Sequence, residues 1–306
     1  MGDGTPAQTI DVLGVSVVVA RADLNHPLQQ GNKRWKLKHN IQAAQQKNAE
    51  VVITFGGAHS NHLLATAHAA HQAGLSVLGV VRGHELQDRP AVWSETLHQC
   101  QQLGMQLVFI SRADYRLKQA APVVQALRQA KPTAYLIPEG GSNQLAVQGV
   151  ADWLQGWAAH LAEPPTHVLC PVGTGGTLAG LVKGAQAMDW RTWLGGVVVL
   201  KGMRSLAADI RRWVGPDTAQ VQWELLTEFH GGGYAKLSDE MLRFGVTFSQ
   251  QTGVPLDKIY NIKSFYALAQ MIQAGRIGIQ DRPLLIHTGG LQGGSLSPPQ
   301  VPTEPE

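Results

Sequence analysis

Short β-branched segments alternate with longer helical segments along most of the 306 residues, and this alternation constrains the fold most. The order is typical of parallel α/β architecture, because a strand that returns to its sheet in the same direction needs a crossover connection, usually a helix. The segment 61–73 illustrates the helical pattern, since Leu63, Leu64 and Ala67 share an apolar face and Gly74 follows as a stop. We expect strands at 16–20, 51–55, 76–81, 106–110, 134–137, 167–170, 196–200 and 283–287.

The composition excludes several classes of protein. With 44% hydrophobic and 15% charged residues, the chain can bury one large core or two moderate ones, so we expect two domains. A formal net charge of +3 with scattered basic residues predicts neither a nucleic-acid nor a membrane partner. The start of the chain lacks the pattern of a signal peptide, and Cys100 and Cys170 have no CxxC-type spacing. We therefore expect a cytoplasmic protein.

Two glycine-containing turns carry polar side chains that could bind a ligand. The Gly-Asn-Lys turn at 31–33 places Lys33 at the mouth of a helix. The glycine-rich segment 56–62 is a strand-to-helix turn that supplies backbone N–H groups, together with the short side chains of Ser60 and Asn61. This pairing suits a lysine held beside a cofactor.

Five further motifs follow the same order along the chain as in one enzyme family. They are Arg-Ala-Asp at 21–23, Ile-Pro-Glu-Gly-Gly-Ser-Asn at 137–143, Thr-Gly-Gly-Thr at 174–177, Tyr-Asn-Ile-Lys-Ser at 260–264 and Ile-His-Thr-Gly-Gly at 286–290. With the two turns, they make the chain resemble the fold type II pyridoxal-phosphate enzymes, in particular the D-cysteine desulfhydrase and 1-aminocyclopropane-1-carboxylate deaminase family.

The resemblance implies a two-domain α/β fold like that of the tryptophan synthase β subunit, in which each domain is a mainly parallel twisted sheet flanked by helices. Residues 1–36 and 145–306 would form the large, cofactor-binding domain, and 37–144 an inserted small domain. It also implies a homodimer. The segment 295–306, rich in proline and ending in acids, is expected to be disordered.

By resemblance, Lys33 is the lysine that forms an imine with the cofactor aldehyde. Its amine must be deprotonated to react, and burial or a neighbouring cation lowers the pKa of a lysine. Lys36 lies three residues on, on the same helical face, and is a candidate for that cation and for a cofactor contact. From the residues alone, the alternative is a solvated helix face.

The turn at 56–62 has the properties of an anion-binding helix start, which would suit a substrate carboxylate. The resemblance implies that Asn61 contacts the cofactor's 3-hydroxyl, that Ser60 lies near the reacting α-carbon, and that both contact the substrate with His62. Ser60 by itself is also an ordinary N-cap residue. His59, His62, His68 and His71 have no supporting cysteine or carboxylate nearby, so we expect no metal site.

The segment 171–180 follows an expected strand and opens a helix, which makes it the candidate phosphate-binding loop. It does not match a dinucleotide fingerprint, because Leu178 stands in place of the third glycine and the next strand leads to Lys201 instead of an acid. A monophosphate fits better. By resemblance, the phosphate contacts are Thr174, Gly175, Gly176 and Thr177.

Four residues near the C-terminal end bear on the reaction. Tyr234 and Tyr260 match positions that line the family's active site, although a lone tyrosine is more often a packed side chain. Ring-opening deaminases carry a glutamate at the position of Asn261 and a leucine at that of Thr288, whereas the desulfhydrase branch has a small hydroxyl residue and a threonine. By resemblance, Asn261 and Thr288 contact the cofactor. A neutral residue at 261 cannot hold a full positive charge on the pyridine nitrogen, which favours β-elimination.

We therefore expect a pyridoxal-phosphate-dependent lyase that converts D-cysteine to pyruvate, hydrogen sulfide and ammonia, with Lys33, Ser60 and Tyr260 as catalytic residues. One alternative is deamination of 1-aminocyclopropane-1-carboxylate, or deamination or racemisation of another small amino acid. Another is a cofactor-binding homologue without turnover. This alternative is suggested by Asn261 and by Arg34 followed by Trp35, because the family usually has an aromatic residue or threonine first and arginine second at these two positions.

Overall fold

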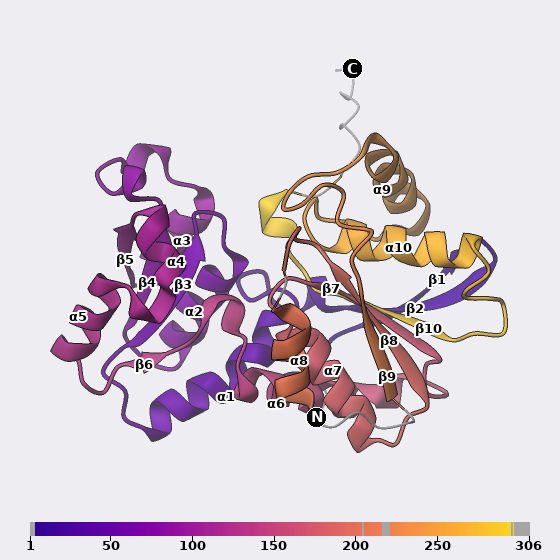
Figure 1. Cartoon of the computed structure of the whole chain (residues 1–306), viewed down its shortest axis with the longest axis horizontal. Helices are drawn as coiled ribbons and strands as arrows, with labels where there is room; N and C mark the ends of the chain where they lie inside the picture. Colours follow the sequence, from indigo (N-terminus) through magenta and orange to yellow (C-terminus); the bar gives the residue numbers. More distant parts are fainter. Residues whose placement is uncertain (1–3, 204, 216–220, 295, 297–306) are drawn as a thin grey trace, which may run out of the picture.

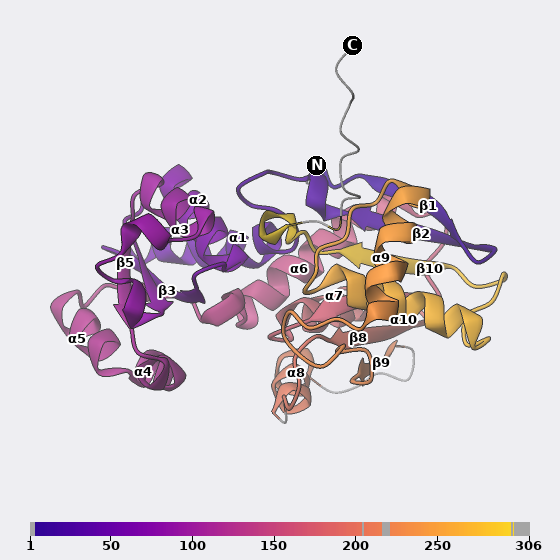
Figure 2. The same ribbon diagram turned by 90° about the horizontal axis from the view of Figure 1, so that it is seen from above.

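The computed structural model describes residues 4–203, 205–215, 221–294 and 296. In this part of the chain, two sheets lie side by side, each with helices packed against it (Figure 1). The view from above shows the same separation, with helices α1 (Lys33–Gln46) and α6 (Gln144–Trp157) between the two sheets (Figure 2). The predicted α/β fold is confirmed.

The larger sheet has six strands in the order β1-β2-β10-β7-β8-β9. Its strands are β1 (Ala7–Val12), β2 (Val15–Arg21), β7 (His167–Val172), β8 (Thr192–Val198), β9 (Val221–Leu226) and β10 (Pro283–His287). β1 pairs antiparallel with β2, and each of the other neighbouring pairs is parallel. Because His287 lies opposite Arg21 and Val172 opposite Val198, the carboxyl ends of β2, β10, β7 and β8 share one edge. This edge is where ligands of open α/β sheets bind.

The smaller sheet is parallel throughout, in the order β5-β4-β3-β6. Its strands are β3 (Val52–Gly57), β4 (Val77–Arg82), β5 (Met105–Ile110) and β6 (Tyr135–Leu136). Successive side chains of β3 pack on opposite faces. Val52 joins the cluster that contains α2 residues, whereas Ile53 joins the one that contains Tyr115 and Val124. Burial on both faces explains the nearly continuous apolar runs of these strands.

Helices cover both faces of each sheet (Figure 1). On the smaller sheet, α1 and its neighbours α2 (Asn61–Gln72) and α3 (Glu95–Gln102) cover one face, and α4 (Arg112–Leu117) and α5 (Pro122–Ala130) cover the other. On the larger sheet, α6, α7 (Gly176–Ala187) and α8 (Leu206–Val214) pack opposite α9 (Asp239–Thr252) and α10 (Asn261–Gln273).

Eight expected strands have counterparts, but the sequence patterns did not reveal β1 and β9. Both are edge strands with an alternating burial pattern, so polar or exposed side chains interrupt their apolar residues. The predicted strand at 196–200 was misplaced, since β8 starts at Thr192 and ends at Val198. Two adjacent glycines, Gly195 and Gly196, are typical of a strand end in the sequence, yet both pair with β7 on one side and β9 on the other.

The division into 1–36 plus 145–306 and 37–144 stays a proposal, and α1 crosses its first boundary. The predicted disorder of 295–306 falls on residues outside the described part of the chain, except Leu296. That residue is buried, and its backbone N–H donates to the Leu256 carbonyl at 2.9 Å. Among the described residues, no helix has the length and apolar character needed to cross a membrane.

Candidate active site

Lys33 begins helix α1, as the Gly-Asn-Lys turn predicts. The turn is tight, because Gly31 has a φ of +65° and a Cβ there would lie 1.8 Å from the Thr288 carbonyl oxygen. The Lys33 Nζ donates to Asn32 Oδ1 at 2.7 Å. Burial lowers the pKa of Lys33 to about 8, against the opposing pull of the Asp257 carboxylate. A deprotonated amine is therefore accessible near neutral pH.

Lys36 is buried in the same turn of α1 and contacts the other side of the site. Its Nζ donates to Ser142 Oγ at 2.7 Å and to the carbonyl of Gly140. Burial, followed by the nearby Lys33, lowers the pKa of Lys36 well below its ordinary value. The expectation that a Lys36 cation lowers the pKa of Lys33 is corrected, since burial is the cause of that lowering.

The loop at 174–177 leads from β7 into α7. It contacts Asn32, which precedes Lys33, and Ser142, which binds Lys36. Asn32 Nδ2 donates to Thr177 Oγ1 at 2.7 Å, and the Ser142 hydroxyl lies 2.6 Å from Thr174 Oγ1. A Cβ on Gly176 would lie 2.6 Å from Ser142 Oγ and 3.3 Å from Lys36 Cε. Backbone N–H groups at a helix start, a lysine and three hydroxyls form a donor set that suits a phosphate.

The start of α2 brings the second turn to the site. Ser60 is the N-cap residue, and its Oγ accepts from Leu63 N at 3.3 Å, so its ordinary capping role is present. Asn61 Nδ2 lies 3.4 Å from the position of a Cβ on Gly290, which also approaches Asp257. These contacts place Asn61 beside the carboxyl ends of the larger sheet.

His62 is buried with one unpartnered ring nitrogen. Thr54 Oγ1 donates to the Ile137 carbonyl at 3.0 Å, so it accepts from His62 Nε2 at 2.7 Å. His62 Nδ1 has no hydrogen-bond partner among the residues that the structure describes. Burial, with Lys36 and Lys33 nearby, lowers the pKa of His62 well below its ordinary value. A neutral imidazole thus presents an acceptor beside Lys36.

Asn261 is completely buried, and its side-chain amide is fully used within the protein. Its Nδ2 donates to Asp257 Oδ1 and to the Gly289 carbonyl, both at 2.6 Å. Its Oδ1 accepts from Thr288 N at 2.9 Å and from Thr288 Oγ1 at 3.3 Å. Asp257 also accepts the backbone N–H groups of 259–261 at the start of α10. Asn261 and Thr288 therefore form a neutral pair fixed by Asp257.

The two tyrosines differ in exposure. Tyr260 lies directly before α10, and its ring is 3.6 Å from the position of a Cβ on Gly173 in the phosphate-binding loop. Burial, with Tyr234 and Asp257 nearby, raises the pKa of Tyr260 well above its ordinary value, so its phenol keeps its proton. Tyr234 is 49% exposed, and burial of its remainder raises its pKa as well.

Sequence reasoning missed three residues that hold the site together: Asn32, Ser142 and Asp257. Asn32 and Ser142 lie inside motifs that were recognised, but their partners are 145 and 106 residues away in the chain. Asp257 had a local signal, because an aspartate four residues before a helix pattern can accept its first N–H groups.

The residues present fit pyridoxal phosphate. The loop at 174–177 has no room for a side chain at Gly176, the orphaned His62 Nδ1 lies near the lysines, and Lys33 has a depressed pKa. In the described part of the chain, no three histidine, cysteine, aspartate or glutamate side chains are arranged to hold a metal ion.

Comparison with known proteins agrees with this site. Residues 3–289 match the family model described as "Pyridoxal-phosphate dependent enzyme". A Thermotoga maritima protein named "Putative 1-aminocyclopropane-1-carboxylate deaminase" is 30% identical, with 94% of each chain covered. The Arabidopsis thaliana "Bifunctional D-cysteine desulfhydrase/1-aminocyclopropane-1-carboxylate deaminase, mitochondrial" is 29% identical over 92% of this chain and 73% of its own.

A solved structure described as an "ACC deaminase homologue" superimposes with a TM-score of 0.79 and 26% identity, covering 94% of this chain and 90% of its own. The family match spans nearly the whole chain and includes the lysine turn, the loop at 174–177 and both sheets. The chain therefore belongs to the pyridoxal-phosphate dependent enzymes.

Proposed function

We propose that this enzyme cleaves D-cysteine, with one water, to pyruvate, hydrogen sulfide and ammonia. The observation that carries the proposal is the neutral Asn261–Thr288 pair, in which each polar atom of the Asn261 amide already has a protein partner. No carboxylate stands at position 261 to hold a full positive charge on the pyridine nitrogen. Moderate electron withdrawal suits loss of a good leaving group from the β-carbon.

The cofactor phosphate is assigned to the donor set around Lys36, the Ser142 hydroxyl and the loop at 174–177. Lys33 would hold the cofactor aldehyde, and Asn61 its 3-hydroxyl. The bound cofactor supplies an electron sink for the substrate α-carbon. The substrate carboxylate is assigned to the start of α2, where Ser60, Asn61 and His62 lie at the positive end of the helix dipole.

The proton transfers are assigned from the pKa shifts. Lys33, whose pKa is about 8, is the group suited to take the substrate α-proton near neutral pH. Tyr260 keeps its proton, because burial raises its pKa, so it serves as a donor and not as a base. Ser60 Oγ accepts an N–H bond as helix cap, which leaves its hydroxyl proton available for the substrate. Tyr234 is assigned to the rim of the active site, where its side chain would contact the substrate.

A second candidate is deamination of 1-aminocyclopropane-1-carboxylate, which is favoured by the names of the similar proteins from Thermotoga and Arabidopsis. The two reactions share the cofactor, the lysine and the substrate carboxylate site. They differ in the bond that breaks, a Cβ–S bond in one and a ring C–C bond in the other. Because no carboxylate stands at position 261, we expect ring opening to be the slower reaction.

The test combines spectra with product analysis. Purified protein is reconstituted with pyridoxal phosphate beside Lys33→Ala, and Lys38→Ala serves as control because Lys38 is an exposed lysine of the same helix. We expect the absorbance band of the lysine-bound cofactor in the wild type and in the control, and its loss or shift in Lys33→Ala. Each protein is then given D-cysteine, L-cysteine and 1-aminocyclopropane-1-carboxylate.

Release of sulfide and pyruvate from D-cysteine, faster than release of 2-oxobutanoate from the cyclopropane substrate, supports the proposal. The opposite order would replace it with the deaminase. A normal band without turnover of any of the three would refute both. The homodimer and the cytoplasmic location are further proposals, to be checked by sedimentation velocity and by fractionation of cells that express the protein.

A further inference from the structure

Lys263 is a lysine that the proposed reaction does not use, although it lies in the first turn of α10 close to Asn261. Its side chain has no exposed surface. The Nζ donates to the Gly233 carbonyl at 2.7 Å and to the Val199 carbonyl at 3.2 Å. The two carbonyls belong to segments that are far apart in sequence. The Lys263 ammonium therefore joins α10 to the residue after β8 and to the loop that contains Gly233.

The position is unfavourable for a cation. Among the described residues, no carboxylate forms an ion pair with Lys263, and the start of a helix carries the positive end of its dipole. Burial accordingly lowers the pKa of Lys263 to about 8, with Asp257 opposing the shift. A buried charge that is held only by carbonyl oxygens costs stability, which an apolar side chain of similar length would avoid.

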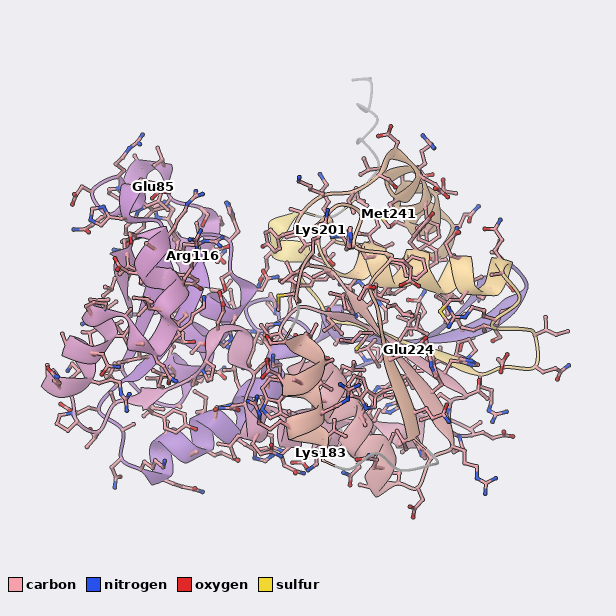
Figure 3. All side chains as sticks on the ribbon, viewed as in Figure 1. Glu85, Arg116, Lys183, Lys201, Glu224 and Met241 are labelled. Atoms are coloured by element: carbon pink, nitrogen blue, oxygen red, sulfur yellow. The ribbon has the colours of Figure 1, made fainter. Side chains whose placement is uncertain are left out.

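The two carbonyls show what the lysine holds. Val199 directly follows β8, and Gly233 directly precedes Tyr234 in the loop at 229–234. Figure 3 labels Lys201 and Met241, two residues that the glycines of this loop approach. A Cβ on Gly233 would lie 3.8 Å from Lys201 Cβ, and one on Gly231 would lie 3.0 Å from Met241 Sδ.

At the end of the loop that precedes Tyr234, the backbone hydrogen bonds stay within the loop and the residues directly after it, and the Gly233 carbonyl also accepts from the Lys236 N–H at 3.2 Å. The Gly232 N–H donates to His230 Nδ1 at 2.8 Å, and the Gly233 N–H donates to the His230 carbonyl at 3.0 Å, so both bonds are internal. Phe229, at the start of the loop, packs against Tyr266 of α10 with ring centroids 6.4 Å apart, whereas the Lys263 bond connects the other end of the loop, at Gly233, to α10.

We propose that Lys263 is a positioning residue whose ammonium fastens the loop at 229–234 to the end of β8 and thereby holds Tyr234 at the rim of the active site. The inference rests on the proposed function only where it assigns Tyr234 to the substrate. The link between loop and strand is testable without turnover.

The first experiment measures the loop directly. Holoenzyme carrying Lys263→Met is digested with trypsin, and cleavage after the exposed Lys236 is followed by mass spectrometry, with Lys258→Met as control because Lys258 is exposed just before α10. Loss of hydrogen bonds from a charged donor should speed this cleavage about ten- to hundredfold, whereas the control should match the wild type. Unchanged cleavage in Lys263→Met with an unchanged Tm would overturn the proposal.

The second experiment asks whether Lys263 acts through Tyr234. In the wild-type background, Lys263→Met should raise KM for the substrate several-fold while kcat changes little. In a Tyr234→Ala background, the same change should leave KM unaltered. Equal effects in both backgrounds, or a proportional loss of active sites instead of a change in KM, would show a purely structural role and refute the assignment.

A third variant covers failure to fold. If Lys263→Met does not give a folded protein, the shorter and uncharged Lys263→Gln is digested in the same way. Loss of the ammonium should again speed cleavage after Lys236, and unchanged cleavage would overturn the proposal. Should the wild type turn over none of the amino acids tested, the proposed function fails, while the cleavage after Lys236 still decides whether Lys263 holds the loop.

Discussion

The depressed pKa of Lys33 predicts how fast the apo-protein captures pyridoxal phosphate at each pH. Only the neutral amine attacks the aldehyde. With a pKa of about 8 in place of the ordinary 10.5, the neutral fraction is about 1% at pH 6, about 9% at pH 7 and about 90% at pH 9. An ordinary lysine at pH 7 is about 0.03% neutral, so the shift increases the reactive amine roughly 300-fold.

The expected rate of capture therefore rises about tenfold per pH unit up to pH 8 and then levels off. The sign follows from burial, which disfavours the ammonium, while Asp257 favours it more weakly. Capture is followed by the growth of the absorbance band in stopped flow from pH 6 to pH 10 at constant ionic strength.

The cofactor also titrates in this range, so each rate is divided by that of Nα-acetyl-lysine under the same conditions. The ratio should stay nearly constant below pH 7 and then fall, by roughly 75-fold at pH 10, as the reference amine loses its proton. Lys33→Ala provides the blank, and Lys38→Ala should behave as the wild type. A ratio that stays flat to pH 10 would refute the argument that burial activates Lys33.

Three substitutions test other parts of the structure. Gly176→Ala places a Cβ 2.6 Å from Ser142 Oγ, and we expect the dissociation constant for pyridoxal phosphate to rise at least about tenfold, measured by fluorescence titration. Asn261→Asp places a second carboxylate beside Asp257, because Asn261 Nδ2 lies 2.6 Å from Asp257 Oδ1. The Asp257 charge should raise the pKa of the new carboxyl in the folded state, so Tm should fall more at pH 8, where repulsion is larger, than at pH 5. Trp157→Ala removes a core side chain that is 1% exposed, and it should cost about 3–5 kcal/mol in urea unfolding.

Each substitution has a contrasting outcome. Gly156→Ala, at a helical position with no heavy atom within 4 Å of the added Cβ, should leave cofactor affinity unchanged, and an equal loss there would contradict the reasoning for Gly176. Equal Tm losses at both pH values would show that Asn261→Asp acts without charge repulsion. A loss for Trp157→Ala no larger than for the half-buried Trp93→Ala would contradict the core assignment.

Local sequence was sufficient for the elements whose signals are local. The helix that starts at Lys33, the N-cap at Ser60 and the end of α2 before Gly74 follow from nearest-neighbour chemistry, because caps and turns need only adjacent backbone groups. The parallel strands were visible because burial on both faces makes them continuously apolar. The edge strands β1 and β9 were not, since exposed polar residues interrupt their apolar positions.

The site depended on contacts between distant segments. Sequence motifs indicated Lys33, the loop at 174–177 and Thr288, but only the tertiary structure joined Asn32 to Thr177 and Lys36 to Ser142. Such bonds depend on how the strands are ordered in the two sheets, which a local pattern does not encode.

The sequence by itself determined the fold class and the kind of ligand and indicated the candidate lysine, because these depend on periodicity, on glycine turns and on the residue types at helix starts. The tertiary structure decided the electrostatics. Burial, not the neighbouring Lys36, lowers the pKa of Lys33, and Asp257 closes the amide of Asn261 to further bonds. Desolvation and hydrogen-bond saturation are properties of the packed chain, so they exist only once the two sheets and their helices enclose these side chains.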